Sequence, residues 1–510
     1  MHKLRAAGGL AAFFAAVMAT SPALAQESGI DEAIASVLGP IASALSTVVF
    51  YQVELFGTQV ELIVIWMLFP LLILTAYYGF VNLRPASFRS AWHIVRGRYH
   101  DPNAPGEVSQ FQALSTALSG TVGIGNIAGV AVAIAWGGPG ATFWMILIGL
   151  CAMSVKFTEC TLGVKYRVRH ADGSVSGGPM YYLRYGLANR GYVKLGLALS
   201  AMYAVFGVPT LLQLATVNQM YSQMEVATGF DQGWLFGVVL AVLVAIVIIG
   251  GIRSIARVTV VLVPLMAGVY ILTALSIILG NLGAIPAAVG VIVTAAFSPE
   301  AVEGGIIGVI IVGMRRAIYS TEAGLGTSSM AHSAAKTSEP VSEGLIGLME
   351  PFIDTVIICT MTALVIVITG AYELRLQGVD DIAITSAAFT SIYPFFDKVL
   401  MVAVLLFGFS TIISWGYYTE KIWTYVFGHS RPSVGTFKAV FCVCLIPGGV
   451  LTATQVFDLI DSLFFLLAIP NIVGLYIMAP EVKRDMQSYF ARLKAGEIKM
   501  NARPEVQAAE

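Results

Sequence analysis

Charged residues are scarce in this chain. Lys, Arg, Asp and Glu together make up 12% of its 510 residues, and 57% of the residues are hydrophobic. Soluble domains typically contain about 25% charged residues, whereas the mean hydropathy here is +0.80. The formal net charge of -1 gives no basis for nucleic-acid binding. The composition therefore predicts a polytopic membrane protein.

Cysteine and histidine are also rare. The cysteines all lie in or beside apolar stretches, which predicts small core residues rather than a disulfide framework or a metal cluster. They are Cys151, Cys160, Cys359, Cys442 and Cys444. The six histidines form no HExxH or comparable pair, and the phosphate-binding pattern GxxxxGK[ST] does not occur. These absences weigh against a membrane-embedded enzyme and against a pump that carries its own ATPase domain.

Apolar runs of about 20 residues, enough to cross roughly 30 Å of hydrocarbon, recur along most of the chain. We count eleven spans, at 58–80, 110–136, 140–164, 196–221, 234–251, 255–280, 283–319, 343–370, 399–423, 434–453 and 457–479. One extra span followed by ten further spans suggests two repeat units of five spans each. Five crossings leave the second unit starting on the opposite side of the membrane, so the repeat must be inverted. The predicted fold is all-α, with an extra helix (58–80) and two five-helix repeats (110–280 and 283–479).

The first residues have a different character. Lys3 and Arg5 precede a short apolar stretch, and the small residues at 23–25 form a cleavage pattern. We predict a signal peptide at 1–25, with an uncleaved first helix as the alternative. Residues 26–57 are predicted to form an amphipathic periplasmic segment.

Basic residues test the topology independently. Most of the 29 Lys and Arg residues fall on the predicted inner side, Arg315 and Arg316 among them, and Arg375 and Lys398 fall outside. This bias is the positive-inside rule. It predicts a bacterial inner-membrane protein with a periplasmic mature N-terminus and a cytoplasmic tail at 480–510.

The first helix of each repeat is expected to be discontinuous. In span 110–136 the sequence TVGIGN places Gly123 and Gly125 around one apolar residue, and each Gly costs roughly 1 kcal/mol against Ala in a helix. We predict unwinding near residues 119–126. In span 283–319 we expect the break at 298–305, around Ser-Pro-Glu and Glu-Gly-Gly.

An unwound segment at membrane depth exposes main-chain groups that can bind a ligand. The amides of Ile124 and Gly125, at the start of the second half-helix, can hold a carboxylate. The carbonyls of Ser119, Thr121 and Val122 suit an ammonium group or a sodium ion. An amino-acid zwitterion carries the two charged ends that this arrangement matches.

Side chains on span 399–423 complete the predicted site. Ser410 and Thr411 are adjacent hydroxyls in an apolar run and suit sodium. The alternative is that they bond back to the preceding turn. Trp415, four residues after Thr411, can close the substrate pocket against large side chains, and the alternative is an interfacial anchor.

Other polar residues receive weaker assignments. Glu107 and Gln112 stand at the entrance of the first broken helix, where the alternatives are a gate and a solvated helix start. Lys156 and Glu159, three apart in one span, are expected to neutralise each other. Three acids, Asp354, Asp461 and Glu303, keep a proton-coupled mechanism open. The polar, small-residue-rich region 315–354 is expected on the cytoplasmic side, as a gating loop, a plain connection or a packed element.

Four segments carry a specific resemblance to a known family. They are GGPGATFWMILIGLCAMSVKFTECTLGVKYR, FQALSTALSGTVGIGNIAGVA, EAGLGTSSMAHSAAKTSEPVSEGLIGLMEPFIDT and FSTIISWGYYTEK. They resemble the alanine/glycine:cation symporter family, which takes up alanine or glycine with sodium. The resemblance implies the fold of amino acid, polyamine and organocation carriers.

The resemblance also implies residue roles. The carbonyls of Ser119 and Val122, with Ser410 and Thr411, are implied to surround one sodium ion. The segment from Thr121 to Gly125 is implied to surround the amino acid, and the positions implied to line the substrate pocket are Gln112, Gln213, Thr411 and Trp415. Asn126 is assigned to gating together with Glu107.

Some positions depart from the family pattern. Ser320-Thr321-Glu322 replaces the usual Ser-Asn-Glu, and the run Pro209-Thr210-Leu211-Leu212 replaces a Gly-Asn-containing run. These changes bear on substrate choice more than on mechanism.

The sequence therefore predicts a secondary transporter, not an enzyme, that imports a small neutral amino acid with Na+ as coupling ion. The alternatives are a proton-coupled carrier, a channel and a membrane-embedded enzyme. The expected partners are the amino-acid substrate and the lipid bilayer, with no obligate protein partner and no tightly bound cofactor.

Overall fold

The computed structural model describes residues 40–55, 58–99, 101, 103–298, 305–377, 382–393, 395–450 and 454–498. The predicted signal peptide at 1–25 lies outside the described residues. So do residues 26–39 of the predicted periplasmic segment and residues 299–304 of the second predicted break, including Glu303.

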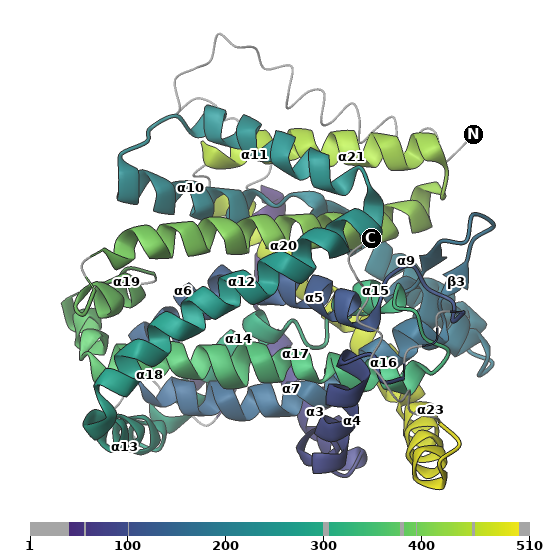
Figure 1. The fold of residues 1–510 in the computed structure, drawn as a ribbon, viewed down its shortest axis with the longest axis horizontal. Helices are drawn as coiled ribbons and strands as arrows, with labels where there is room; N and C mark the ends of the chain where they lie inside the picture. The colour runs from purple at the N-terminus through teal and green to yellow at the C-terminus, as the bar shows by residue number, and fades with distance from the viewer. Residues whose placement is uncertain are drawn as a thin grey trace.

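The described residues are almost entirely helical (Figure 1). Up to residue 280 the helices are Pro40–Val49, α3 (Leu62–Tyr77), η1 (Val81–Leu83), α4 (Pro85–Val95), α5 (Gln110–Thr121), α6 (Ile124–Gly137), α7 (Gly140–Lys165), α8 (Pro179–Tyr181), η2 (Tyr182–Gly186), α9 (Val193–Gly207), η3 (Val208–Leu211), α10 (Leu214–Thr228), α11 (Gly233–Ile248) and α12 (Gly251–Gly280). The later helices are η4 (Leu282–Ala284), α13 (Ile285–Ala296), α14 (Gly305–Thr321), α15 (Ser328–Ser333), α16 (Pro340–Gly347), α17 (Met349–Pro351), η5 (Phe352–Cys359), α18 (Thr360–Ile368), η6 (Ala371–Gln377), α19 (Ile382–Thr390), α20 (Phe396–Phe427), α21 (Arg431–Leu445), η7 (Ile446–Gly449), α22 (Thr454–Leu466) and α23 (Ala468–Ala495). Two antiparallel hairpins complete the fold, β1 (Gln52–Leu55) with β2 (Thr58–Glu61) and β3 (Val168–Arg169) with β4 (Val175–Ser176).

Within the described residues, 8 helical stretches are long and apolar enough to cross a membrane. Four shorter apolar helices accompany them, Pro40–Val49, Leu62–Tyr77, Gly233–Ile248 and Leu282–Ala296. Figure 1 shows α7, α14 and α20 crossing the view in similar directions and α12 running obliquely to them, with α13 and α19 at the left end and β3 at the right. The prediction of an all-α polytopic membrane protein is therefore confirmed.

The first predicted discontinuity is present and is short. Helix α5 ends at Thr121 and α6 begins at Ile124. Between them Val122 (φ -73°, ψ 98°) and Gly123 (φ -146°, ψ -157°) are extended. The main chain is therefore open at the place where TVGIGN predicts unwinding.

A further discontinuity, which the sequence did not predict, follows α14. Helix α14 ends at Thr321, and a non-helical turn from Glu322 to Thr327 connects it to α15. In this turn Glu322 has φ 52°, and Gly324 and Gly326 also have positive φ. The crossing is therefore α14 with α15, and α13 is a separate helix beside the start of α7. Most of the predicted break at 298–305 lies outside the described residues, between the end of α13 at Ala296 and the start of α14 at Gly305.

The structure also corrects the side assigned to two basic residues. Arg315 Nη1 lies 2.8 Å from Glu61 Oε1, just before α3 begins. Arg316 lies over the ring of Trp136, near the end of α6. The start of the first span and the end of the second share one side of the membrane, the predicted outer side. On the predicted topology both arginines therefore lie on the outer side, and their inner assignment was wrong, because the crossing is α14 with α15 and continues beyond residue 319, where the span was expected to end.

The region 322–350 is a packed element and not an exposed loop. Nearly every residue of it is buried, and α15 and α16 pack against α7. A Cβ added to Gly347 would lie 2.5 Å from Cys160 Sγ, and one added to Gly163 would lie 2.8 Å from the Ser329 carbonyl oxygen. Small residues therefore allow these backbones to approach closely. Of the three alternatives, the packed element is confirmed.

Candidate functional site

Hydroxyl groups of α20 meet the last turn of α5. Thr411 Oγ1 donates to the Ser119 carbonyl oxygen at 3.2 Å, and Ser410 Oγ lies 3.4 Å from the same oxygen. Ser410 also bonds back to Phe407 at 2.9 Å, as the alternative interpretation expected. Ser414 Oγ donates to the Thr116 carbonyl at 3.0 Å. Three of the four groups predicted for sodium, namely Ser119, Ser410 and Thr411, are therefore together.

The fourth predicted group, the Val122 carbonyl, lies in the break itself. A continuous helix would pair it with the amide of Asn126, but that amide bonds to the Gly123 carbonyl at 3.2 Å. The Val122 carbonyl thus stands outside the helical ladder. Neutral oxygens of this kind are the ligands that a monovalent alkali cation takes in transporters.

On the other side of the break, the side chain of Asn126 bonds to the main chain and to neighbouring helices. The Oδ1 atom of Asn126 accepts from the Gly123 amide at 2.8 Å, and its Nδ2 donates to Asp354. Asp354 also accepts from Ser320 at 2.5 Å and from Thr355 at 2.9 Å. All of these side chains are buried. Asn126 therefore connects the first break to the end of α14 and to η5.

The start of α6 offers main-chain donors. The first amides of a helix have no partner within that helix, and the helix dipole gives them positive character. Ile124 and Gly125 occupy these positions. Gly125 is exposed, and nothing lies within 4 Å of a Cβ added there. A carboxylate therefore has room to approach these donors. Thr121, across the break, bonds back to Ala117 at 3.4 Å.

Aromatic side chains cover the site on α20. Trp415 is 4% exposed, and its ring lies 5.7 Å from that of Phe464 and 5.8 Å from that of Tyr418. This burial excludes the interfacial-anchor alternative for Trp415. Gln213 is buried at the start of α10, which packs against α20, and donates to the Thr210 carbonyl at 2.9 Å.

Two predicted residues lie away from the break. Gln112 caps α5, since its Oε1 accepts from the Ser109 amide at 2.9 Å. Nine residues of helix, about 13 Å at 1.5 Å per residue, separate it from Thr121. Glu107 accepts from the Val175 amide at 2.9 Å and so holds the β3–β4 hairpin. The structure places both residues at the end of the bundle that the hairpin occupies.

Buried charges surround the second break. Lys156 Nζ lies 3.1 Å from Glu350 Oε2 and 2.8 Å from Ser328 Oγ. Glu159 instead accepts from the Gly324 amide at 3.0 Å and from Asn471 at 2.8 Å. The expected Lys156–Glu159 pair was wrong, because α17 brings a closer carboxylate to the lysine.

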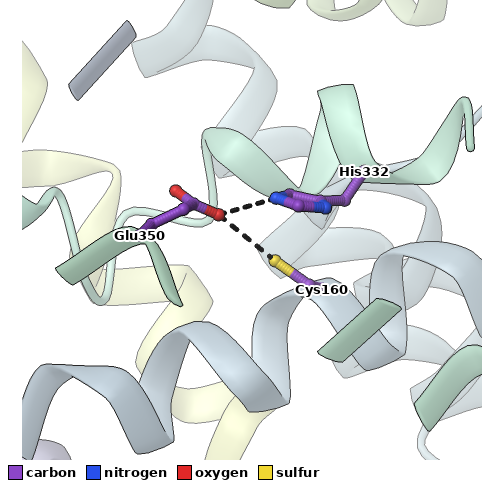
Figure 2. Close-up of side chains that lie close together, drawn as sticks. All are labelled: Cys160, His332 and Glu350. Carbon is purple, nitrogen blue, oxygen red and sulfur yellow. Dashed lines mark hydrogen bonds and ion pairs between the residues drawn. The ribbon is translucent and has the colours of Figure 1, made fainter. Parts of the chain in front are cut away.

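A histidine extends this network. His332 lies between two carboxylates, with Nδ1 2.7 Å from Glu343 and Nε2 2.7 Å from Glu350. Figure 2 shows the same Glu350 oxygen also facing Cys160 Sγ, at 3.9 Å. Cys160, His332 and Glu350 thus have metal-ligand spacing. However, Lys156 and His332 already place positive groups on Glu350, so we interpret the cluster as an ion-pair network that stabilises the packed element.

The β3–β4 hairpin carries titratable groups outside the membrane-spanning helices. The rings of His170 and His429 stack with centroids 4.3 Å apart. Burial and the neighbouring His429 lower the pKa of His170. Hydrogen bonds from the Ser174 hydroxyl and amide lower the pKa of Asp172 to about 2. The hairpin therefore favours a neutral His170 and an ionised Asp172.

Two site residues escaped the sequence prediction. Ser414 follows Ser410 by four residues and therefore shares its helix face, a spacing that could have identified it. Glu322 lies in the second break, is 5% exposed, and accepts from Thr327 at 2.6 Å. It was noted only as part of a motif, because the helix was expected to break elsewhere.

Comparisons with known proteins show which family the chain belongs to. A model of the sodium:alanine symporter family matches residues 43–503. The sodium/alanine symporter AgcS of Methanococcus maripaludis is 36% identical over 424 residues, covering 82% of this chain and 91% of that protein. An uncharacterised transporter of Haemophilus influenzae is 37% identical over 432 residues, covering 83% and 92%. The crystal structure of MhsT in complex with L-phenylalanine superposes with a TM-score of 0.50 at 14% identity, covering 77% of this chain and 96% of that one.

Proposed function

The chain belongs to the sodium:alanine symporter family, and we propose that it imports a small neutral amino acid, alanine or glycine, together with Na+ by alternating access. Amino-acid:cation symport as such follows from family membership, and the chain is a transporter rather than an enzyme. The identity of the ion and of the amino acid is our proposal.

The observation that carries the proposal is the meeting of α20 with the first break. The Ser119 carbonyl oxygen accepts hydrogen bonds from the hydroxyls of Ser410 and Thr411. This donor set is neutral and oxygen-only, and it supplies ligands to Na+ without requiring a buried counter-charge. A Na+ ion bound there would hold α5 and α20 together, so release of the ion would free them to separate.

The amino acid is proposed to bind beside this ion. Its carboxylate would approach the amides of Ile124 and Gly125, where a helix N-terminus favours negative charge. Trp415 would limit the length of the side chain. Asn126 would keep the break open by holding the Gly123 amide.

The orientation in the membrane is also proposed. We place the β1–β2 hairpin outside and the C-terminal end of α23 inside the bacterial inner membrane, because most basic residues then face the cytoplasm. One positive charge that moves inward across 100 mV releases about 2.3 kcal/mol, which can drive accumulation of the substrate.

Uptake of radiolabelled alanine by purified protein in liposomes tests the proposal. We expect saturable accumulation that requires an inward Na+ gradient. Downhill flux that does not saturate would indicate a channel, and the absence of flux of any amino acid would reject transport. A panel of unlabelled competitors would identify the preferred amino acid.

One observation favours a second candidate, a proton-coupled carrier. Asp354 is completely buried, and its hydrogen bonds come from Asn126, Ser320 and Thr355, which are all neutral. Such a carboxyl group can exchange a proton during transport. Alanine accumulation driven by an inward pH gradient in Na+-free buffer would support this candidate and would contradict the Na+ assignment.

A further inference from the structure

The turn between α14 and α15 holds a buried acid close to the helices of the first break. Glu322 has φ 52°, a left-handed conformation that residues other than Gly seldom adopt and that often marks functional sites. Its carboxylate accepts from Thr327 at 2.6 Å. Helix α15, which follows this turn, packs against α5 and α20, so the strained turn lies beside the two helices that meet at the first break.

No basic side chain among the described residues forms an ion pair with Glu322. The nearby Lys156 uses its ammonium group on Glu350 and Ser328. A completely buried carboxylate with neutral hydrogen-bond donors and no bonded cation is costly. A positively charged ligand would supply the missing partner.

A second observation points to a ligand at the same place. Within the described part of the chain, the buried hydroxyl of Tyr418 has no hydrogen-bond partner. A Cβ added to Gly120 would lie 3.0 Å from this hydroxyl, which therefore stands over the last turn of α5. The last carbonyls of a helix carry partial negative charge. The unpaired hydroxyl, the carboxylate of Glu322 and this helix end are all suited to a cationic group.

Three residues of α20 that lie near the first break share one face of this helix. Thr411, Trp415 and Tyr418 follow each other at intervals of four and three. Thr411 lies opposite Gly123, and Tyr418 lies opposite Gly120. The face thus runs from the proposed Na+ ligands past Trp415 to the free hydroxyl.

We propose that Glu322 binds the ammonium group of the substrate, that Tyr418 is a second partner of this group, and that the pair selects α-amino acids over the corresponding α-hydroxy acids. This inference rests on the proposed function and makes it more specific. The carboxylate of the substrate then lies at the start of α6 and its ammonium group lies near the end of α5. The two ends of the broken helix thereby bind the two ends of the zwitterion.

The test compares Glu322→Gln with Glu159→Gln in the full-length protein in liposomes. Both acids are buried, but Glu159 already accepts from the Gly324 amide and from Asn471, whereas Glu322 accepts from Thr327. Loss of one charge-assisted hydrogen bond should raise the KM of alanine about tenfold or more in Glu322→Gln. The Na+ concentration that gives half-maximal uptake should stay within about twofold, and Glu159→Gln should keep the wild-type KM for alanine.

Competition with lactate, which has a hydroxyl in place of the ammonium group, provides a second measurement. Lactate should not inhibit alanine uptake by the wild type and should inhibit it in Glu322→Gln. Tyr418→Phe removes one hydroxyl and should raise the KM of alanine about threefold or more without lowering stability. This variant tests the pocket even if Glu322→Gln does not fold.

The outcomes separate this inference from the proposed function. If the wild type shows Na+-driven alanine uptake but Glu322→Gln and Tyr418→Phe both keep its KM, the ammonium site is rejected while symport stands. If Glu322→Gln keeps its KM and loses only a dependence on external pH, Glu322 carries a proton and the inference is also rejected. If the wild type does not take up alanine, the proposed function itself fails.

Discussion

The two helix breaks use different chemistry. The first, at Val122 and Gly123, is surrounded on the α20 side by the hydroxyls of Ser410, Thr411 and Ser414, which bond to carbonyl oxygens of α5. The second, from Glu322 to Thr327, lies among buried carboxylates and cations that bond to one another.

This difference suggests a division of roles. Hydroxyl and carbonyl groups can bind and release a monovalent ion at low cost, because no buried charge is left behind. A buried ion pair loses much more when one partner is removed. The first break is therefore suited to reversible ligand binding, and most of the second to fixed structure, with Glu322 as the exception that we propose binds the substrate.

The largest effect should come from breaking the charge network at the second break. Lys156→Met removes the ammonium group next to Glu350 and should destabilise the protein by about 3–5 kcal/mol, since a buried carboxylate loses its partner. The melting temperature of the purified protein in detergent measures this loss. The double variant with Glu350→Gln should recover part of it, and a melting temperature like that of the wild type in Lys156→Met would show that the network is not needed for stability.

Loss of a hydroxyl at the first break should alter function with little effect on folding. Thr411→Ala should raise the Na+ concentration for half-maximal uptake about fivefold to tenfold. This change corresponds to the loss of one ligand that contributes about 1 kcal/mol to Na+ binding. Thr419→Ala is the matched control, because its hydroxyl bonds back to Trp415 within α20 at 2.7 Å. An equal change in both variants would reject the Na+ assignment of Thr411.

A smaller effect is expected at the aromatic cover of the first break. Trp415→Phe shortens the side chain above the pocket, so the KM of valine relative to that of alanine should fall about threefold. Trp423→Phe, on the same helix and bonded to Ser433 at 3.2 Å, should leave this ratio unchanged. Continued exclusion of valine by Trp415→Phe would show that another group limits side-chain size.

The smallest effect should occur at the β3–β4 hairpin, outside the membrane-spanning helices. The lowered pKa of His170 means that the folded protein takes up this proton at a lower pH than the unfolded chain. The contribution of His170 to folding stability is fully present above the pKa of the unfolded chain, about 6.5, and is lost as the pH falls below this pKa. Asp172 and Glu107, which favour the protonated ring, and Lys421, which opposes it, also face this histidine.

Replacing His170 by Asn should therefore flatten the dependence of the melting temperature on pH between 7.5 and 5.5. We expect a difference of about 1–2 °C from the wild type over this range. An unaltered dependence would mean that the titration belongs to another group.

Local sequence predicted the first break well but missed the one from Glu322 to Thr327. At Gly123 and Gly125 low helix propensity and the required polar site coincide, so the pattern was informative. The break predicted at 298–305 rests on Pro and Gly alone, and most of it lies outside the described residues. Glu322 is followed by Gly324 and Gly326, but the sequence left this region open as a gating loop, a plain connection or a packed element, so no helix break was assigned to it.

Side-chain partners were harder to predict than positions. Ser410 and Thr411 could be assigned because both lie on one helix, and their partner Ser119 was already implicated by the break. The partner of Lys156 could not be found in this way. Glu350 lies 194 residues away, and only the packing of α16 and α17 against α7 brings it nearer than Glu159.

The close packing of glycine residues has a consequence for movement. Gly163, Gly344 and Gly347 bring α7, α15 and α16 together with no space for even one added carbon atom. Surfaces in such contact cannot slide past each other without first separating. We therefore expect these helices to rotate as one rigid body during the cycle, with the displacement concentrated where α5 and α20 meet through hydroxyl groups.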